Sequence, residues 1–441
     1  MHEAQHQAKG ASLAGRSVEA VWRIEAPRLV AGLTRLVGGD LGLAEDLAQD
    51  ALVAALEQWP AESVPRNPGA WLMTVAKRRG VDLIRRDQTY ARKLELLGRD
   101  LVTMQGEAES GPEEALDAPD IEDDLLRLVF TACHPVLPAQ ARVALTLRLL
   151  GGLTIAEIAR AYLVPEPTIS QRIVRAKRTL AEKNIAYEVP SGPELAERLA
   201  SVLEVIYLIF NEGYAASTGA DWVRPTLCDD AVRLARVLGA LMPKEPEVHA
   251  LAALLELQSS RLAERVGADG AVVLLGDQDR SKWNRMFIRR GFAALATAEN
   301  LSSAAGRPSG PYALQAGIAA CHARALTAEE TDWPTIARLY TALLVQLPTP
   351  VVALNRAVAV AMADGPEAGL ALVDELADTE ALPNYHLLPA VRGDLLVKLN
   401  RFDEAGVEFT RAAELAGNAA ERTLLEQRAA DARQRADRPA M

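Results

Sequence analysis

The stretch Leu-Thr-Ile-Ala-Glu-Ile-Ala-Arg-Ala-Tyr, from Leu153 to Tyr162, is followed by Leu-Val-Pro-Glu-Pro and then by Thr-Ile-Ser-Gln-Arg-Ile-Val-Arg-Ala-Lys-Arg-Thr-Leu, which ends at Leu180. Apolar residues recur at spacings of three and four on both sides of the proline-containing break, which indicates two short helices joined by a tight turn. This is the helix-turn-helix plan, whose second helix contacts DNA bases. The residues of that second helix predicted to face the core are Ile169, Ile173, Ala176 and Leu180.

The opposite face of the same helix carries polar and basic side chains that suit DNA. Glutamine and arginine can make bidentate contacts with base edges, and the other cations can bind phosphates. Thr168 is predicted to be the N-cap, where the helix terminus could also meet a phosphate. The alternative interpretation is a solvated basic helix. The residues of this face and its flanks are Ser170, Gln171, Arg172, Val174, Arg175, Lys177 and Arg178.

A second basic helix is predicted from Gly69 to Arg86, about seventy residues before the first motif. Trp71 and Val75 lie on its apolar side, and Trp71 could serve either as a core residue or as a stacking platform for DNA. An acidic, amide-bearing helix from Asp40 to Trp59 and a Pro/Asn loop from Pro60 to Pro68 precede it. The cations of the basic helix are Lys77, Arg78, Arg79, Arg85 and Arg86.

Charge is distributed unevenly along the 441 residues, whose net charge is −11. Residues 1–190 carry 23 basic and 26 acidic side chains, and ten of those acids lie between Asp100 and Asp124, where there is no basic residue. The stretch 98–124 also contains Gly, Ser and Pro, so we predict an acidic linker that cannot fold alone. It separates two basic helical units, whose charge suits nucleic acid.

Spacings of three and four continue along the rest of the chain without an alternating strand pattern, so the predicted fold class is all-α. A Pro/Gly-containing break at residues 189–193 precedes a long Ala- and Leu-rich part. Segments beginning at Trp333, Gly365 and Phe402 then echo one another at offsets of 32 and 37 residues. These offsets bracket the roughly 34 residues of a tetratricopeptide repeat, a stacked helix pair, although an ordinary helical bundle is the alternative. The predicted parts are residues 18–97, 98–124, 125–188, 189–330 and 331–435.

The order of an acidic helix, a loop, a Trp-bearing basic helix, an acidic linker and a helix-turn-helix resembles that of the extracytoplasmic-function (ECF) sigma factors of bacterial RNA polymerase. The resemblance covers about residues 18–188 and rests on two separate motifs in the correct order. It implies that residues 18–97 bind core RNA polymerase and the minus-ten element of promoter DNA. Residues 125–188 would bind the minus-thirty-five element. Core polymerase would perform the chemistry, and this chain would supply promoter choice and strand opening.

The resemblance also assigns individual contacts. Asp46 and Asp50, which are also an i, i+4 acidic pair suited to a basic partner surface, belong to the implied polymerase-binding set of Glu45, Asp46, Gln49 and Asp50. The loop from Glu62 to Pro68 would capture a base flipped out of the duplex. The implied minus-ten set is Asn67, Trp71, Lys77, Arg78, Arg79, Arg85 and Arg86. The implied minus-thirty-five set is Thr168, Ser170, Gln171, Arg172, Arg175, Lys177 and Arg178.

The whole chain resembles the subgroup of these factors that has a large C-terminal extension ending in tetratricopeptide-like repeats. The segments that carry this resemblance are Thr131–Pro135, Asn211–Tyr214 and Asp277–Trp283. It implies that the extension regulates the factor, with a protein or a small molecule as its possible partner. The residues themselves favour a buried hydrogen-bond network over a ligand site. This polar set is Asn211, Glu212, Tyr214, Asp229, Arg233, Asp277, Asp279 and Arg280.

Other classes of function have little support in the sequence. It contains no Gly-rich phosphate loop and no nucleophile elbow, so we expect no catalytic residue and no enzyme. Cys133-His134 and Cys321-His322 lack partners at metal-ligand spacing, so we expect neither metal nor cofactor. No apolar run approaches the roughly 18 residues of a membrane helix, and no secretion signal is apparent. We therefore expect a cytoplasmic protein without a membrane partner.

Two alternative functions remain open at this point. A conventional helix-turn-helix regulator with a tetratricopeptide-like sensor would bind DNA without melting it, but it leaves the unit from Asp40 to Arg86 unexplained. A tetratricopeptide interaction scaffold would leave both basic surfaces unexplained.

Overall fold

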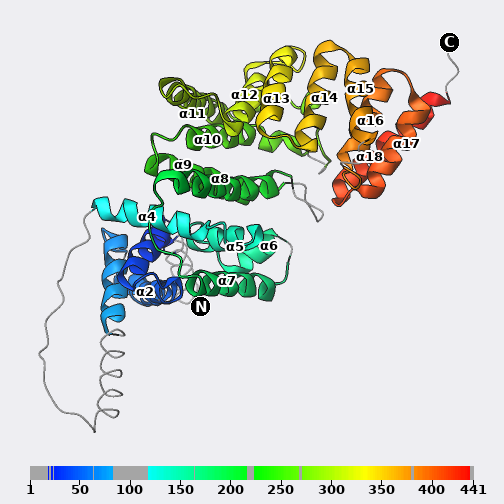
Figure 1. Cartoon of the computed structure of the whole chain (residues 1–441). Helices are drawn as coiled ribbons and strands as arrows, with labels where there is room; N and C mark the ends of the chain where they lie inside the picture. The colour runs from blue at the N-terminus through cyan, green and yellow to red at the C-terminus, as the bar shows by residue number, and fades with distance from the viewer. Residues whose placement is uncertain are drawn as a thin grey trace, which may run out of the picture. The chain divides into compact units, whose positions relative to one another are not determined.

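The computed structural model describes residues 18–437 except 19–20, 23, 63, 83–117, 163, 216–222, 268–270 and 379–381. The described residues are predominantly helical, with an isolated strand-like bridge between Val266 and Val272. The all-α prediction is therefore confirmed. The chain divides into two compact units after Val205 (Figure 1). This division falls within helix α8 (Gly192–Tyr214), downstream of the break predicted at residues 189–193.

The first unit begins with an N-terminal domain, residues 18–82, made of a helix at 24–36, α2 (Leu41–Glu62) and a helix at 68–82. Asp40 initiates α2, because its Oδ1 accepts hydrogen bonds from the backbone N–H groups of Gly42 at 2.9 Å and Leu43 at 3.0 Å. The sequence predicts a loop from Pro60, but α2 continues to Glu62. The largest side chains fully buried in this domain are Leu33, Leu47 and Leu72.

The helix-turn-helix domain comprises residues 118–188 and follows as α4 (Ala118–Ala132), α5 (Ala139–Leu149), α6 (Ile155–Ala161) and α7 (Glu166–Glu182). Thr154 and Glu157 form a capping box that fixes the start of α6. The predicted helix pair is confirmed, because α7 buries all four of the residues assigned to its core stripe.

The prediction that Thr168 caps α7 is wrong. The helix begins at Glu166 after Pro165, and Pro167 lies in its first turn. Proline is favoured there because its fixed φ suits a helix and the first N–H groups have no intrahelical partner to lose. Thr168 therefore lies inside the first turn, and the N-cap position, Pro165, lies three residues earlier than predicted.

The first half of α8 packs on the helix-turn-helix domain. Arg142 Nη1 donates hydrogen bonds to Ser201 Oγ and, at 2.9 Å, to Glu204 Oε2. Ser201 Oγ in turn donates to the carbonyl oxygen of Cys133 at 2.5 Å. Arg198 Nη2 donates to the carbonyl oxygen of Phe130 at 3.1 Å. The segment Thr131–Pro135, singled out in the sequence, thus helps to hold the start of α8.

The second unit continues from the end of α8 through α9 (Pro225–Leu241), α10 (Pro246–Ser259), α11 (Arg285–Ala304) and α12 (Pro311–Arg324). Helices α10 and α11 approach so closely at Gly291 that a Cβ there would lie 2.6 Å from Leu257 Cγ. The core formed by these helices includes Leu254, Leu257, Trp283, Ile288 and Leu295.

Six further helices form three consecutive pairs: α13 (Trp333–Gln346) with α14 (Pro350–Asp364), α15 (Pro366–Asp378) with α16 (Leu387–Lys398), and α17 (Phe402–Leu415) with α18 (Ala419–Ala436). Each helix packs on the next (Figure 1). The first helix of each pair begins at, or one residue after, the start of one of the echoing segments. The predicted helix hairpins are therefore present, and their assignment to the tetratricopeptide family stays a prediction.

Candidate nucleic-acid interface

The outward face of α7 keeps several predicted DNA contacts accessible to solvent. Gln171 and Arg175 are exposed, and Val174 between them is 61% exposed. Arg178 is also exposed, but its Nε donates a hydrogen bond to Glu182 Oε1 at 2.6 Å, so DNA would have to compete with this carboxylate. The half-buried members of the predicted set are Thr168, Ser170, Arg172 and Lys177.

Lys177 differs from the other cations of α7, because it is bonded to the N-terminal domain. Its Nζ donates to Glu45 Oε2, while Arg148 Nε of α5 donates to Glu45 Oε1 at 2.5 Å. Gln49 Nε2 of α2 also donates to Glu45 Oε1, at 3.0 Å. One predicted polymerase contact and one predicted DNA contact are thus bonded to each other.

The environment of Glu45 favours its charged form. The residue is only 8% exposed, and burial alone would raise the pKa of its carboxyl. The nearby charges of Lys177 and Arg148, together with their hydrogen bonds, outweigh burial and hold the pKa of Glu45 below its ordinary value. Glu45 is therefore an ion-paired carboxylate at neutral pH.

The solvent-facing side of α2 carries the exposed acids of the predicted polymerase-binding set, Asp46 and Asp50. Val53 and Leu56 continue this face at helical spacing and are 49% and 47% exposed. The prediction from sequence missed both residues. The sequence could have shown their exposure, because both lie outside the buried stripe that contains Ala44, Ala48 and Ala51.

The predicted minus-ten contacts lie around the helix at 68–82. Asn67 Oδ1 accepts a hydrogen bond from Ala70 N at 3.1 Å and thereby caps this helix. Arg78 is exposed and Lys77 is half-buried, while Arg79 Nη1 lies 3.1 Å from Asp50 Oδ2. Arg85 and Arg86 lie outside the described residues.

The apolar side of the 68–82 helix is displaced by one residue from its predicted position. Leu72, Ala76 and Gly80 are buried, whereas Trp71 and Val75 are half-buried. The Trp71 ring meets the buried Trp59 ring edge to face at 5.4 Å. Trp71 therefore packs against the core with part of its surface and retains an accessible part.

The conspicuous polar segments of the second unit make internal contacts. At Gly213 the end of α8 approaches α9 so closely that a Cβ would lie 2.8 Å from Cys228 N, and Glu212 pairs with Arg224. Asp279 Oδ1 accepts a hydrogen bond from Ser281 N, and Arg280 Nη1 donates to two carbonyl oxygens at the end of α12. Arg280 is buried, as predicted for a hydrogen-bond network, but Asp229, Asp277 and Asp279 are exposed, so the prediction of one buried network is wrong for these three acids.

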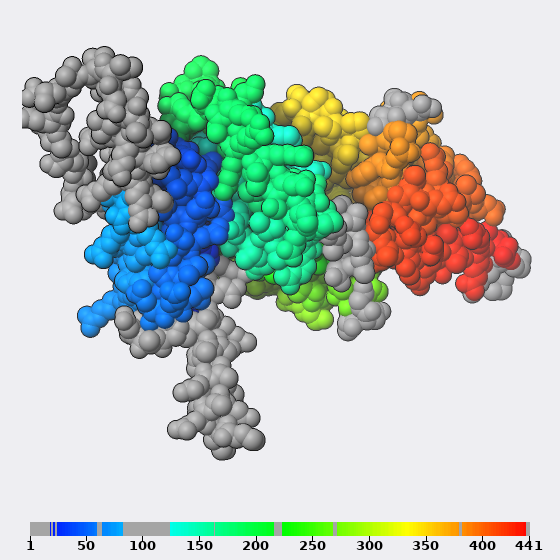
Figure 2. All heavy atoms as spheres, turned by 90° about the horizontal axis from the view of Figure 1, so that it is seen from below, coloured from blue at the N-terminus to red at the C-terminus, as the bar shows by residue number. Residues whose placement is uncertain are grey.

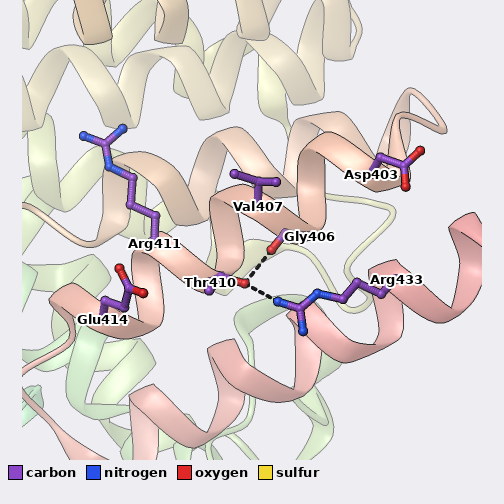
Figure 3. A pocket seen from close by; sticks show the side chains of 7 residues that line it. All are labelled: Asp403, Gly406, Val407, Thr410, Arg411, Glu414 and Arg433. Atoms are coloured by element: carbon purple, nitrogen blue, oxygen red, sulfur yellow. Dashed lines mark hydrogen bonds between the residues drawn. The ribbon is translucent and has the colours of Figure 1, made fainter.

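A shallow pocket of about 340 Å³ lies between α17 and α18 (Figure 3). Thr410 Oγ1 donates to the carbonyl oxygen of Gly406 at 2.7 Å and accepts a hydrogen bond from Arg433 Nη2 at 2.6 Å. Because its lining carries two acids and two arginines, the pocket favours neither an anion nor a cation. It is lined by Asp403, Gly406, Val407, Thr410, Arg411, Glu414 and Arg433.

The part of the chain that the structure describes contains no group of three or more His, Cys, Asp or Glu side chains placed to hold a metal ion. None of its helices combines the length and the apolar character needed to cross a membrane.

Comparison with known families matches separate parts of the chain. Residues 23–90 match the model of sigma-70 region 2, and residues 127–180 match sigma-70 region 4. Residues 198–299 match a family of unknown function, DUF6596. These matches cover the N-terminal domain, the helix-turn-helix domain and the first part of the extension.

Individual relatives agree with the family matches. An uncharacterized protein of Rhizobium meliloti is 46% identical over 382 residues, which are 87% of this chain and 88% of that protein. The ECF RNA polymerase sigma factor SigK of Mycobacterium ulcerans is 30% identical over 155 residues, 34% of this chain and 77% of SigK. SigW of Bacillus subtilis, also an ECF sigma factor, is 24% identical over 149 residues, 33% of this chain and 77% of SigW. The chain therefore belongs to the ECF sigma factors and carries a long helical C-terminal extension beyond their two shared domains.

Proposed function

We propose that this sigma factor reads the minus-thirty-five element of its promoters with the exposed face of α7. The carrying observation is that α7 buries its complete apolar stripe while Gln171 and Arg175 stay exposed. Glutamine can read adenine in the major groove, and arginine can bind guanine or a phosphate. The 68–82 helix and the loop before it bind the minus-ten element in this proposal. Arg78 and the accessible part of Trp71 contact the DNA during strand opening.

Core RNA polymerase is the proposed partner of the solvent-facing side of α2. This side combines the acids Asp46 and Asp50 with the exposed apolar residues Val53 and Leu56. Apolar residues bordered by charge suit a protein partner, because burial supplies affinity and charge supplies orientation. If this face of α2 met only water, exposing Val53 and Leu56 there would bring no advantage.

The C-terminal extension is proposed to control this activity within the cytoplasm, in response to a protein or a small molecule. Support comes from α8, whose first half is hydrogen-bonded to the helix-turn-helix domain and whose second half packs against the core of the second unit through Tyr207. A change in the extension therefore has a continuous helix through which to act.

In vitro transcription tests the proposed function directly. Core polymerase is supplied with the full chain, or with a truncation after Val205, on a library of upstream DNA from the same genome. This cut keeps Ser201 and Glu204 as partners for Arg142, which a cut at the end of the helix-turn-helix domain would remove.

Start sites that require the chain would support the proposal, and a gain or loss on truncation would give the sign of regulation. A matched pair, Val53→Asp on the proposed polymerase face and Val407→Asp on the exposed face of α17, tests the role of α2. Only the first should abolish transcription. If neither form directs a start site while the full chain still binds duplex DNA, a conventional regulator replaces this proposal.

A further inference from the structure

A group of polar side chains from four elements meets inside the C-terminal extension. Arg261 directly precedes the 3₁₀ helix η1 (Leu262–Arg265), Tyr214 ends α8, His322 lies on α12 and Tyr340 lies on α13. These elements are coloured green to yellow in Figure 2. We propose that Arg261, His322 and Tyr340 form a binding site for a small anion that carries a carboxylate or a phosphate group.

Arg261 supplies the charge of this site. The residue is half-buried, and its guanidinium lies over the Tyr214 ring, with Cζ 5.4 Å from the ring centroid. Within the part of the chain that the structure describes, the Arg261 side chain makes no hydrogen bond and no ion pair. A guanidinium has five N–H donors, which suit the paired oxygens of a carboxylate or a phosphate. Arg261 therefore offers an anion a full set of unused donors.

Two further polar groups close to Arg261 are also unused. Among the described residues, the Tyr340 hydroxyl makes no hydrogen bond, and His322 Nδ1 is buried without a hydrogen-bond partner. The charge of Arg261 acts on both side chains, which places them near its guanidinium. Buried polar groups normally have partners, so unmatched groups gathered around one charge indicate a missing ligand. A few convergent polar groups are what fixes a small ligand in its site.

The electrostatics of the site favour an anion over a cation. Arg280 Nη1 donates to the carbonyl oxygen of His322 at 3.0 Å, which brings a second positive charge to the site. Burial, followed by the charges of Arg261 and Arg280, lowers the pKa of His322 to about 3, so its imidazole is neutral at neutral pH. Burial raises the pKa of Tyr340 to about 12 against the effect of Arg261, so its hydroxyl keeps its proton.

Nearby acids do not replace such a ligand. Glu329 and Glu330 act on Arg280, but both are exposed, where water screens their charge. The three hydrogen-bond acceptors of Arg280 are the uncharged oxygens of two carbonyl groups and the Thr331 hydroxyl. Burial lowers the pKa of Arg280, and repulsion from Arg261 lowers it further. An anion between the two arginines would turn this repulsion into attraction.

Aromatic rings border the site and suggest the body of its ligand. The Tyr214 ring also meets the guanidinium of Arg265, with Cζ 3.8 Å from the ring centroid. The Trp333 ring meets the His322 ring edge to face at 5.3 Å. Rings of this kind pack against apolar or aromatic groups. We therefore expect an aromatic acid such as benzoate to bind more tightly than acetate.

The site gives the extension a chemical signal to which it can respond. An anion bound by Arg261, His322 and Tyr340 would hold η1, α12 and α13 together and would stabilise the second unit by mass action. The link between this binding and transcription rests on the proposed function, in which the extension controls the factor. The binding itself does not depend on polymerase or DNA.

Isothermal titration calorimetry on the full chain tests the site. Benzoate, acetate and inorganic phosphate are titrated separately at constant ionic strength, with chloride as the reference anion. We expect saturable binding at one site per chain. Binding of benzoate or acetate would identify a carboxylate ligand, whereas binding of phosphate alone would identify a phosphate ligand. If none of the three binds more tightly than chloride, the site is refuted.

Three variants test the named residues. Arg261→Gln should weaken binding about ten- to a hundredfold, because hydrogen bonds between charged groups are lost. Tyr340→Phe removes one hydroxyl and should weaken binding about two- to tenfold. Arg289→Gln, on the exposed side of α11, makes the same charge change as Arg261→Gln and should leave binding unchanged. Binding by Arg261→Gln as tight as that by Arg289→Gln would overturn the proposal.

Thermal unfolding without added anion separates binding from a structural role. Tyr340→Phe should leave the unfolding temperature unchanged, because its hydroxyl makes no hydrogen bond with the described residues of the free chain. If Arg261→Gln does not fold, Tyr340→Phe decides, and unchanged affinity in that variant would refute the site. Failure of the unaltered chain to direct transcription would refute the proposed function instead and would leave the calorimetric result unaffected.

Discussion

Replacing Gln171 with alanine should separate base reading from phosphate binding on α7. The side chain is exposed, and within the described part of the chain its amide makes no hydrogen bond, so the substitution should leave folding unchanged. The neighbouring core residues Ile169 and Ile173 are untouched. A bidentate base contact contributes about 1–3 kcal/mol of discrimination, so its loss lowers the ratio of specific to non-specific affinity roughly 5- to 150-fold.

The matched comparison is Arg175→Gln, which removes an exposed charge from the same face. If Arg175 binds a phosphate, its loss should weaken binding to every sequence and reduce the slope of log affinity against log salt by about 0.9. Gln171→Ala should leave that slope unchanged, because it removes no charge.

Fluorescence anisotropy over a series of salt concentrations measures both quantities. The specific duplex is selected from a random pool by the unaltered chain with core polymerase, and a scrambled duplex of equal length serves as the non-specific reference. Equal weakening of both duplexes by Gln171→Ala, or a changed salt slope, would refute base reading by this residue.

Three further predictions follow from other contacts. Glu182→Gln should raise duplex affinity about twofold in anisotropy measurements, because an exposed i, i+4 pair such as Arg178–Glu182 contributes only about 0.3–0.5 kcal/mol; unchanged affinity would show that Arg178 does not bind DNA. Phe409→Ala should lower the free energy of unfolding of the second unit by about 3–5 kcal/mol in urea titrations, whereas exposed Val407→Ala should change it by less than about 0.5 kcal/mol. Burial and, to a smaller extent, the charge of Asp229 raise the pKa of the Cys228 thiol to about 12, so native Cys228 should resist maleimide at neutral pH. Because the thiol ionises more readily in the unfolded chain, the free energy of unfolding should decline as the pH rises above 9.0, the ordinary thiol value. Rapid labelling of the folded chain would contradict the assigned burial.

The parts of the fold with a strong local pattern were predictable from sequence. The stripe from Ile169 to Leu180 repeats at helical spacing and is buried as expected. The echoing segments mark the starts of α13 and α17 at Trp333 and Phe402, because each begins a helix with its own core-facing residues. Local patterns work here because each helix buries one continuous face.

The errors concern features that neighbouring residues decide. Thr168 has the chemistry of a cap, but two prolines favour an earlier helix start. The buried stripe of the 68–82 helix passes through Leu72 and Ala76, while Trp71, beside it, is half-buried and meets the Trp59 ring edge to face.

Contacts between distant parts of the chain left no signal in the sequence. Glu45 and Lys177 each belong to a plausible functional face, and nothing in their local pattern indicates that they meet. Such a pairing depends on how two domains pack. The spacing of residues within a single sequence does not reveal that packing. The individual functional assignments of both residues stay predictions.

The continuity of α8 has a consequence for anyone who builds hybrid sigma factors. A transplant of the extension would normally be joined at a flexible linker, but this junction is a single helix that contributes Ser201 to one core and Phe210 to the next. A graft cut within residues 192–214 would mismatch one side or the other. The transferable module is therefore the extension together with all of α8 and the Thr131–Pro135 segment on which that helix rests.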